Sequence, residues 1–342
     1  MNSSASRFFI LHGVAVFLCA ALHNPIALGA DRLRIGLSSF TPINAALWIA
    51  EDRGIFKKYG IDSEVIYMRG GPTLLSGMLS GDIQVGWTAS GIIAPVAEGA
   101  DFVIVAGFNN RVTDELIVRP GIKRPEDLRG KRFGVQSIGG GGWMGVMLGL
   151  ESLGLEPKRD DIRMLVIGDN TIRGQALESG TIDATSLDGA FARKAKARGL
   201  VSLADFSTAN IPIMNHVVAV KKTYLQRQPE IVENVLRALV EGLAFTWSPK
   251  SKSAVLRSVA RRLRITDAAI AEDGYQELLT RGGLEKRPHP SVEGMRNVQR
   301  LMQISNPRVG EVKLDDVLDR SLMRKLEDSG FIDRMYNLYP PK

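Results

Sequence analysis

Apolar runs alternate with amphipathic segments over residues 33–220. Residues 33–38, 64–68, 83–87 and 102–106 are short apolar runs with β-branched side chains, which is typical of strands. Between the first two runs, Ile43, Ala46, Leu47 and Ala50 have the spacing of one helix face. Strands that alternate with short helices predict an α/β fold with a mostly parallel sheet.

One β-α-β-α-β unit occurs twice at a nearly constant offset. Residues 34–39 recur as residues 132–137, and residues 79–83 recur as residues 178–182. The apolar run at 65–68 corresponds to the run at 165–167. Two similar α/β lobes in one chain predict a cleft between them, and such clefts bind small molecules.

The remaining pattern divides the chain between these lobes. Residues 109–119 are expected to cross into the second lobe, and the extended stretch 215–220 to return to the first. We therefore assign residues 31–109 and 216–342 to lobe I and residues 110–215 to lobe II. Helices are expected at 229–247, 252–263, 267–281 and 315–335, because apolar residues such as Ile231, Val235, Leu239 and Leu243 repeat every four positions.

The N-terminal residues have the layout of a secretory signal peptide. Arg7 precedes the apolar segment 8–22, and small residues follow up to Gly29 and Ala30, near which we expect cleavage. A transmembrane anchor is the alternative, but the apolar segment is shorter than the roughly 20 residues that a span requires. We therefore predict residues 1–30 to be removed and the protein to be periplasmic.

Composition excludes several classes of function. Cys19 is the single cysteine and lies within the predicted signal peptide, so the mature chain would lack disulfides, thiol catalysis and cysteine metal sites. Phe17 and Leu18 before it fit a lipoprotein signal poorly. The net charge of +7 falls to about +6 when Arg7 is removed, and no basic run is interleaved with aromatic residues, so nucleic acid is not an expected partner.

The ends of the predicted strands carry candidate ligand contacts. In parallel α/β sheets, ligands bind beyond the carboxyl ends of the strands. Residues 38–41, 70–73 and 88–90 follow strands of the first lobe and carry hydroxyl groups or glycines. Each hydroxyl could instead cap a helix.

The glycine run at 140–145 matches the pattern G-x-G-x-x-G between a strand and a helix. A dinucleotide site would also need an acidic residue at the end of the next strand, and Asp160, Asp161 and Asp169 do not fit that position. Backbone N–H groups at a helix N-terminus could bind an anion there. A tight turn that needs glycine for packing is the other interpretation.

Few residues indicate catalysis. Asp188 follows the third strand of the second lobe and could bind an ammonium or hydroxyl group, although we favour a helix cap. Arg173 is expected on a solvated helix face. His216 is interpreted as a satisfied structural histidine, and it shares no metal-ligand spacing with His289. Neither G-x-S-x-G nor H-E-x-x-H occurs.

Four segments together resemble periplasmic solute-binding proteins of the nitrate, sulfonate and taurine type, a group that includes binders of thiamine precursors. These segments are residues 48–56, 79–86, 128–135 and 176–184. The resemblance implies a type II periplasmic binding protein fold, with two α/β lobes hinged by two crossover strands. It also implies closure on a ligand and delivery to the permease and ATPase of an ABC importer, by a monomer without cofactor.

Carried over by position, the resemblance implies ligand contacts at Ser39, Phe40, Thr41, Gly71, Pro72, Thr73, Thr88, Ser90, Ser137, Gly139, Gly140, Gly141, Gly142, Asp188 and Asn215. Asn109, Asn110 and Asn215 would lie beside the hinge. Phe40 or Trp143 could cover an apolar part of the ligand, or belong to the core.

The ligand is expected to be a small anionic or heteroaromatic solute, such as a sulfonate, nitrate or carboxylate. We favour a small organic acid or sulfonate held by backbone N–H groups and hydroxyls, although Asp188 argues against a simple oxyanion. A sensor that docks on a membrane receptor is the alternative function. An enzyme resembling the thiamine pyrimidine synthases is disfavoured, because those rely on a histidine and a cysteine-rich motif.

Overall fold

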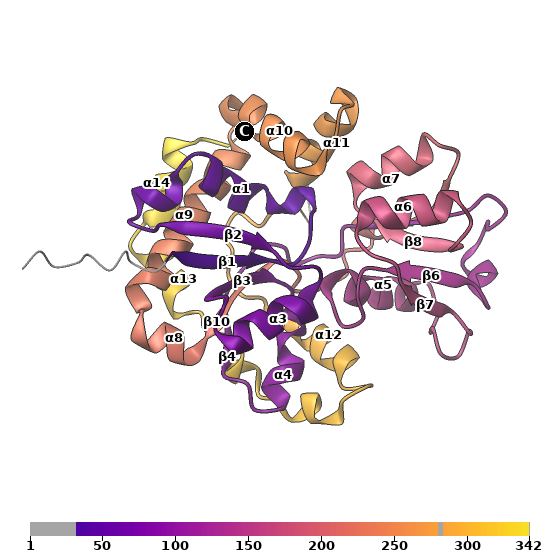
Figure 1. Cartoon of the computed structure of the whole chain (residues 1–342), viewed down its shortest axis with the longest axis horizontal. Coiled ribbons are helices and arrows are strands. Elements are labelled where there is room, and N and C mark those ends of the chain that lie inside the picture. The colour runs from indigo at the N-terminus through magenta and orange to yellow at the C-terminus, as the bar shows by residue number, and fades with distance from the viewer. Residues whose placement is uncertain (1–31, 280–282, 342) are drawn as a thin grey trace, which may run out of the picture. The chain divides into compact units, whose positions relative to one another are not determined.

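Two five-stranded mixed sheets organise the computed structural model, which describes residues 32–279 and 283–341 (Figure 1). The first sheet has the order β2-β1-β3-β10-β4, with β1 at Leu33–Leu37, β2 at Ser63–Tyr67, β3 at Val85–Thr88, β4 at Phe102–Gly107 and β10 at Val217–Lys221. The second has the order β7-β6-β8-β5-β9, with β5 at Glu115–Val118, β6 at Arg132–Val135, β7 at Arg163–Val166, β8 at Ala184–Leu187 and β9 at Val201–Asp205. The predicted signal peptide, with Cys19 and the cleavage site, lies outside the described residues.

The two sheets share one topology, as the sequence repeat predicts. The strands β1, β2 and β3 pair in parallel, and β6, β7 and β8 do the same in the second sheet. The fourth strand of each sheet is antiparallel to both of its neighbours: β10 pairs with β3 and β4, and β5 pairs with β8 and β9. Each sheet is therefore mostly parallel, with one reversed strand that the chain supplies as it changes sheets.

We name the residues around the first sheet the first lobe and those around the second sheet the second lobe. The two segments that connect the lobes lie side by side. The backbone N–H of Asn215 donates to the carbonyl oxygen of Asn109 at 2.9 Å, and that of Ile213 donates to Asn110 at 3.1 Å. Arg111 and Pro212 form an antiparallel bridge. The described residues thus place Asn109, Asn110 and Asn215 together at the connection.

Helices flank both sheets (Figure 1). The α-helices are α1 Ala45–Asp52, α2 Ile55–Lys58, α3 Gly71–Ser80, α4 Ile93–Ala97, α5 Gly141–Ser152, α6 Asn170–Glu178, α7 Gly189–Lys196, α8 Lys222–Arg227, α9 Pro229–Trp247, α10 Lys252–Leu263, α11 Ala268–Leu278, α12 Val292–Met302, α13 Ser321–Asp328 and α14 Phe331–Leu338. Short 3-10 turns are η1 Pro42–Asn44, η2 Ser90–Ile92, η3 Pro125–Leu128, η4 Phe206–Thr208, η5 Pro249–Ser251, η6 Pro307–Glu311 and η7 Leu314–Asp316.

Most predicted elements occur where the pattern places them, and α9 and α10 have the predicted bounds. The helix expected at 315–335 is instead two helices, because Gly330 adopts a left-handed conformation at φ 69° between α13 and α14. The crossover expected at 109–119 contains β5. Strand β9 and helix α12 have no counterpart in the sequence prediction.

Helix α9 packs against α1, which follows the loop after β1 and the turn η1. Its buried face includes Val235, Leu239 and Leu243. Gly242 faces α1, and a Cβ atom there would lie 2.4 Å from the carbonyl oxygen of Ala46. Each fully buried leucine or valine contributes about 1.5–3 kcal/mol, so this contact anchors α1 firmly. Among the described residues, no helix combines the length and hydropathy that a membrane span requires.

Candidate functional site

A cavity of about 60 Å³ is formed jointly by the two lobes. We call it the inner pocket. It lies at strand ends of both sheets and at the starts of helices α3, α5, α6 and α7. Its lining consists of Ser38, Ser39, Thr41, Ile43, Gly71, Thr88, Ala89, Thr113, Asp114, Gln136, Ser137, Gly140, Gly141, Gly142, Asn170, Arg173, Asp188, Asn215 and His216.

Most of the residues singled out in the sequence meet in this pocket, and five do not. Those in the lining are Ser39, Thr41, Gly71, Thr88, Ser137, Gly140, Gly141, Gly142, Asp188 and Asn215. Pro72, Thr73, Ser90 and Gly139 are outside that lining, and Phe40 lines a second cavity. The hydroxyl of Ser90 donates to the carbonyl oxygen of Met214. Sequence reasoning did not give Thr113, Asp114 or Gln136 as ligand contacts, and it placed Ile43 on a helix face.

A buried asparagine positions the loop that follows β1. Asn44 donates from Nδ2 to the carbonyl oxygen of Ser39 at 2.6 Å and accepts at Oδ1 from Nε1 of Trp87 at 2.9 Å. Thr41 precedes η1, but its side chain makes no cap hydrogen bond. Its Oγ1 lies 3.4 Å from Nε2 of His216 instead. The loop is thereby held rigidly, with the Thr41 hydroxyl at the pocket.

The glycine run lets the two lobes approach each other closely. Gly140 precedes α5 in an extended conformation, and the helix begins at Gly141. A Cβ atom on Gly141 would lie 2.9 Å from Cβ of Ala89 in the first lobe, whereas one on Gly142 would meet nothing within 4 Å. A Cβ atom on Gly140 would lie 2.4 Å from the hydroxyl oxygen of Ser137. Close packing therefore accounts for Gly140 and Gly141, and both still line the inner pocket.

Arg173 is buried, so its predicted place on a solvated helix face is wrong. Acceptors on β8 and around the start of its own helix, α6, satisfy its side chain. Nε donates to Oγ1 of Thr185 at 3.1 Å, Nη1 to the carbonyl oxygen of Gly168 at 2.8 Å, and Nη2 to that of Ser186 at 3.1 Å and to Oδ1 of Asn170. Protein acceptors thus engage four of its five N–H groups.

Asp188 occupies the N-cap position of α7, yet its side chain makes no cap hydrogen bond. This position agrees with the favoured interpretation as a helix cap, and the backbone N–H of Phe191 in the first turn of α7 lies close enough to lower the pKa of the carboxyl. Its Oδ2 accepts from Nδ2 of Asn170 at 2.6 Å. Burial raises the pKa of Asp188 well above its usual value, and the carboxylates of Asp114 and Glu277 raise it further, while Arg173 opposes them. Burial likewise raises the pKa of Asp114, which accepts a hydrogen bond from Ser186.

Three buried polar atoms in the lining have no hydrogen-bond partner in the described chain: Oγ1 of Thr88, Oδ1 of Asp188 and Nδ1 of His216. His216 is only 8% exposed, and burial lowers its pKa to about 4. It is therefore neutral near pH 7. Because its Nδ1 has no partner in the described chain, the prediction of a fully hydrogen-bonded histidine is wrong. Buried polar atoms are nearly always paired, so three unpaired ones around one cavity indicate a place where a ligand binds.

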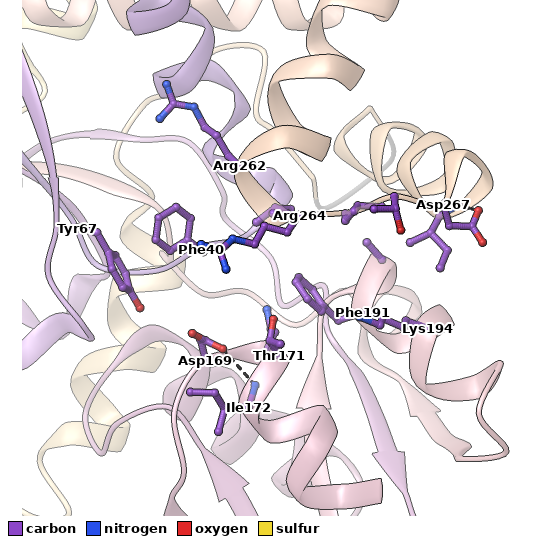
Figure 2. A pocket seen from close by; sticks show the side chains of 16 residues that line it. Phe40, Tyr67, Asp169, Thr171, Ile172, Phe191, Lys194, Arg262, Arg264 and Asp267 are labelled. Carbon is purple, nitrogen blue, oxygen red and sulfur yellow. Dashed lines mark hydrogen bonds between the residues drawn. The ribbon is translucent and has the colours of Figure 1, made fainter.

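A larger cavity of about 510 Å³, which we call the outer pocket, also lies between the lobes. Phe40, Tyr67 and residues 262–267 line it from the first lobe, and residues 169–172, Phe191 and Lys194 line it from the second. Figure 2 shows the Arg264 side chain extending toward Phe40, above Asp169 and Thr171. Asn170 lines both pockets and therefore lies where they adjoin.

Polar contacts between the lobes surround these pockets. Arg193 on α7 pairs with Asp273 at 2.8 Å and with Glu277 at 2.9 Å, both on α11. Nε2 of Gln136 donates to the carbonyl oxygen of Ser38 at 3.1 Å. The lobes are thus in contact around the candidate site. In the described part of the chain, no group of three or more His, Cys, Asp or Glu residues could hold a metal ion.

A family model described as "NMT1/THI5 like" matches residues 41–251, which is more than half of the chain. The chain belongs to the NMT1/THI5-like family. The match begins at Thr41 in the inner pocket and extends through β10 into α9 and beyond. It therefore includes the second lobe entirely and most of the inner pocket.

A curated relative of this NMT1/THI5-like protein is a candidate binding protein of Brucella abortus (strain 2308). It is 29% identical over 142 residues, which cover 41% of this chain and 42% of the relative. The match thus spans less than half of the relative's length. The shared segment indicates that the two proteins are related. The function of this chain does not follow from it.

Several solved structures resemble this NMT1/THI5-like protein over most of its length. The alkanesulfonate-binding protein SsuA from Xanthomonas axonopodis pv. citri, bound to MOPS, has a TM-score of 0.67 at 18% identity and covers 85% of this chain and 98% of its own. The periplasmic nitrate-binding protein NrtA from Synechocystis PCC 6803 has a TM-score of 0.67 at 13% identity, with 87% and 88% covered. These similarities establish the two-lobed α/β fold of periplasmic binding proteins, as the sequence predicts.

One structural neighbour is an enzyme. The desulfurization enzyme DSZB has a TM-score of 0.56 at 18% identity, and the match covers 87% of this chain and 99% of the enzyme. The fold therefore serves binding in several neighbours and catalysis in at least this one. The residues of the site must decide between these uses.

Proposed function

We propose that this NMT1/THI5-like protein is the solute-binding component of an ABC importer. It captures a small molecule between its lobes in the periplasm and delivers it to a permease. The observation that carries the proposal is the pair Thr88 and Asp188. Each side chain is buried, each has an unpaired oxygen at the inner pocket, and they come from different lobes.

A ligand that bonds to both lobes stabilises the closed arrangement over an open one. Its differential affinity for the two arrangements supplies the free energy of closure. Thr88 ends β3 in the first sheet, and Asp188 follows β8 at the equivalent place in the second. One molecule in the inner pocket could thus satisfy groups from both halves of the repeat.

A binding role fits the chemistry of this pocket better than catalysis. Cys19 is the single cysteine of the whole sequence and lies in the predicted signal peptide. His216 has a pKa of about 4 because it is buried, so it is a weak base near neutral pH. Hydroxyls, backbone N–H groups and fixed carboxyls remain, and these groups orient a ligand.

Thermal unfolding of the mature protein with candidate solutes tests the proposal. A solute at about 100 times its dissociation constant adds about 2.7 kcal/mol to the free energy of unfolding, which is a readily measured shift. Thr88→Val should abolish that shift. Thr73→Val is the matched control, because Thr73 is exposed on α3 and does not line the pocket. Chemical conversion of a bound solute on incubation would instead favour an enzyme.

Export and delivery need separate measurements. Periplasmic extraction followed by mass determination should give a chain that begins near Ala30, if the signal peptide is cleaved as expected. Deletion of the gene should abolish uptake of the radiolabelled solute, and a Thr88→Val copy should not restore it. Normal uptake in the deletion strain would argue for the sensor function instead of the importer.

A further inference from the structure

We infer that the inner pocket binds a nitrogen group of the ligand that donates hydrogen bonds and carries positive charge, such as an ammonium, amidinium or guanidinium, with Asp188 as its acceptor. This inference rests on the proposed function and narrows the class of solute. It replaces the sulfonate or organic acid favoured by the sequence alone.

The charges that line the inner pocket do not suit an oxyanion. Asp114 and Asp188 supply two carboxyl groups, and Arg173 is the one basic side chain among the lining residues that is charged near neutral pH. Four of the five N–H groups of Arg173 already bond to protein acceptors. Among the charged side chains, an anionic ligand would find one available guanidinium N–H and two acids. A cationic group would find both acids without a competing free cation.

The orientation of Asp188 is fixed by a chain of buried hydrogen bonds. Arg173 donates to Oδ1 of Asn170, so the amide nitrogen of Asn170 faces Asp188 and donates to its Oδ2. The other oxygen, Oδ1, is buried and has no partner in the described chain. Asp188 as a whole is only 8% exposed. An ionised carboxylate in this position needs a donor from the ligand, because burial without one is costly.

A protonated Asp188 could instead donate a hydrogen bond to an oxyanion, and substitution by asparagine separates the two cases. Burial and the carboxylates of Asp114 and Glu277 raise the pKa of Asp188, and Arg173 lowers it. A cation beside Oδ1 would favour the ionised form and release a proton on binding. The amide introduced by Asp188→Asn could reproduce the donor of a protonated acid, but it could not reproduce the charge of a carboxylate.

The inner pocket accommodates the nitrogen group and little more. A volume of about 60 Å³ corresponds to roughly four to six water-sized positions. The rest of a larger ligand would extend past Asn170 into the outer pocket of about 510 Å³. We therefore expect the nitrogen group of the bound ligand to lie in the inner pocket and the rest of the ligand to lie in the outer pocket.

Titration calorimetry with two sets of probes tests the inference. The nitrogen set is benzamidine, agmatine and ethanolamine, and the oxyanion set is nitrate, methanesulfonate and benzoate. We expect binding from the nitrogen set, release of protons in buffers of differing ionisation enthalpy, and at least 100-fold weaker binding by Asp188→Asn. The exposed Asp161 supplies the matched control, and Asp161→Asn should bind within twofold of wild type. Binding of the oxyanion set alone, or unchanged affinity in Asp188→Asn, would overturn the inference.

Native mass spectrometry separates failure of this inference from failure of the proposed function. The mature protein is incubated with a small-molecule extract of its own cells, and the retained molecule is identified by fragmentation. A retained molecule with a basic nitrogen supports both proposals. A retained oxyanion without one supports a binding function and refutes the nitrogen group. If no molecule is retained from the extract, the proposed function fails, and this inference fails with it.

Discussion

Gly141 of the second lobe lies so close to Asn215, at the connection between the lobes, that no side chain fits between them. A Cβ atom on Gly141 would lie 2.0 Å from Oδ1 of Asn215 and 2.9 Å from Cβ of Ala89. The side chain of Asn215 could turn away, whereas Ala89 has no freedom to do so. Contact between the lobes here therefore depends on the absence of a side chain at Gly141.

Gly141→Ala should weaken ligand binding at least 10-fold and leave the fold intact. The added methyl group obstructs closure, and each lobe can accommodate it by opening. The tightest-binding probe in calorimetry supplies the affinity, and small-angle X-ray scattering should give a larger radius of gyration for the liganded variant than for the liganded wild type. Gly142→Ala is the matched control, since a Cβ atom there meets nothing within 4 Å. Equal affinity in both variants would contradict this account.

The sequence predicts those parts of the fold that local patterns encode. Helix α9 follows from apolar residues four positions apart, and the shared topology of the two sheets follows from the repeat. Strand β9 is partly exposed and has the sequence VSLAD, so its pairing with β5 depends on distant residues. Helix α12 could have been found, because Met295, Val298, Leu301 and Met302 have helical spacing and are buried.

The positions of site residues that follow strands can be predicted from the sequence. Contacts between side chains that are distant in the sequence cannot. The glycine run and Asp188 are visible as residues after strands. The burial of Arg173 is not, because its partners Thr185 and Ser186 belong to strand β8, which comes beside the helix only in the folded protein. The surroundings of His216 are equally hidden in the sequence, because its neighbour Thr41 lies 175 residues earlier in the chain.

Arg173→Met should lower the free energy of unfolding by about 3–5 kcal/mol. Loss of the guanidinium leaves Asn170, Thr185 and two carbonyl oxygens without a donor and leaves Asp188 without a compensating charge. Urea denaturation at pH 7 measures the change. Arg198→Met is the control, because Arg198 is exposed and its pair with Glu178 should contribute less than about 1 kcal/mol. If both variants lost a similar free energy of unfolding, the buried hydrogen bonds of Arg173 would not contribute more than a surface ion pair.

Arg193→Ala should weaken ligand binding by about 2- to 10-fold without loss of stability within each lobe. Arg193 pairs with Asp273 and Glu277 of the other lobe, and these partly exposed pairs favour closure by an amount typical of surface ion pairs. The effect should shrink in 1 M salt, which screens such pairs. Arg198→Ala serves as the comparison, since Arg198 pairs with Glu178 inside the second lobe. A loss of affinity that is unchanged at high salt would point to packing instead of charge.

His216 should make the protein less stable as the pH falls from about 6.5 to about 4. Burial lowers the pKa of His216 from 6.5 to about 4, so over this range the unfolded chain binds a proton that the folded chain excludes. The unfolded state therefore gains stability as the pH falls, by up to about 3 kcal/mol at the acid end. Asp188 and Asp114 act in the opposite direction, because their raised pKa values let the folded chain retain protons.

His216→Gln isolates that contribution, because the carboxyl groups remain the same in both proteins. Urea denaturation of wild type and variant at pH 7, 6, 5 and 4 measures the free energy of unfolding. The difference between the two proteins should shift in favour of the variant as the pH falls, by up to about 3 kcal/mol at pH 4. Glutamine keeps a polar group near Thr41, so part of the contact survives. If the two pH profiles run parallel, His216 does not titrate as a buried neutral imidazole.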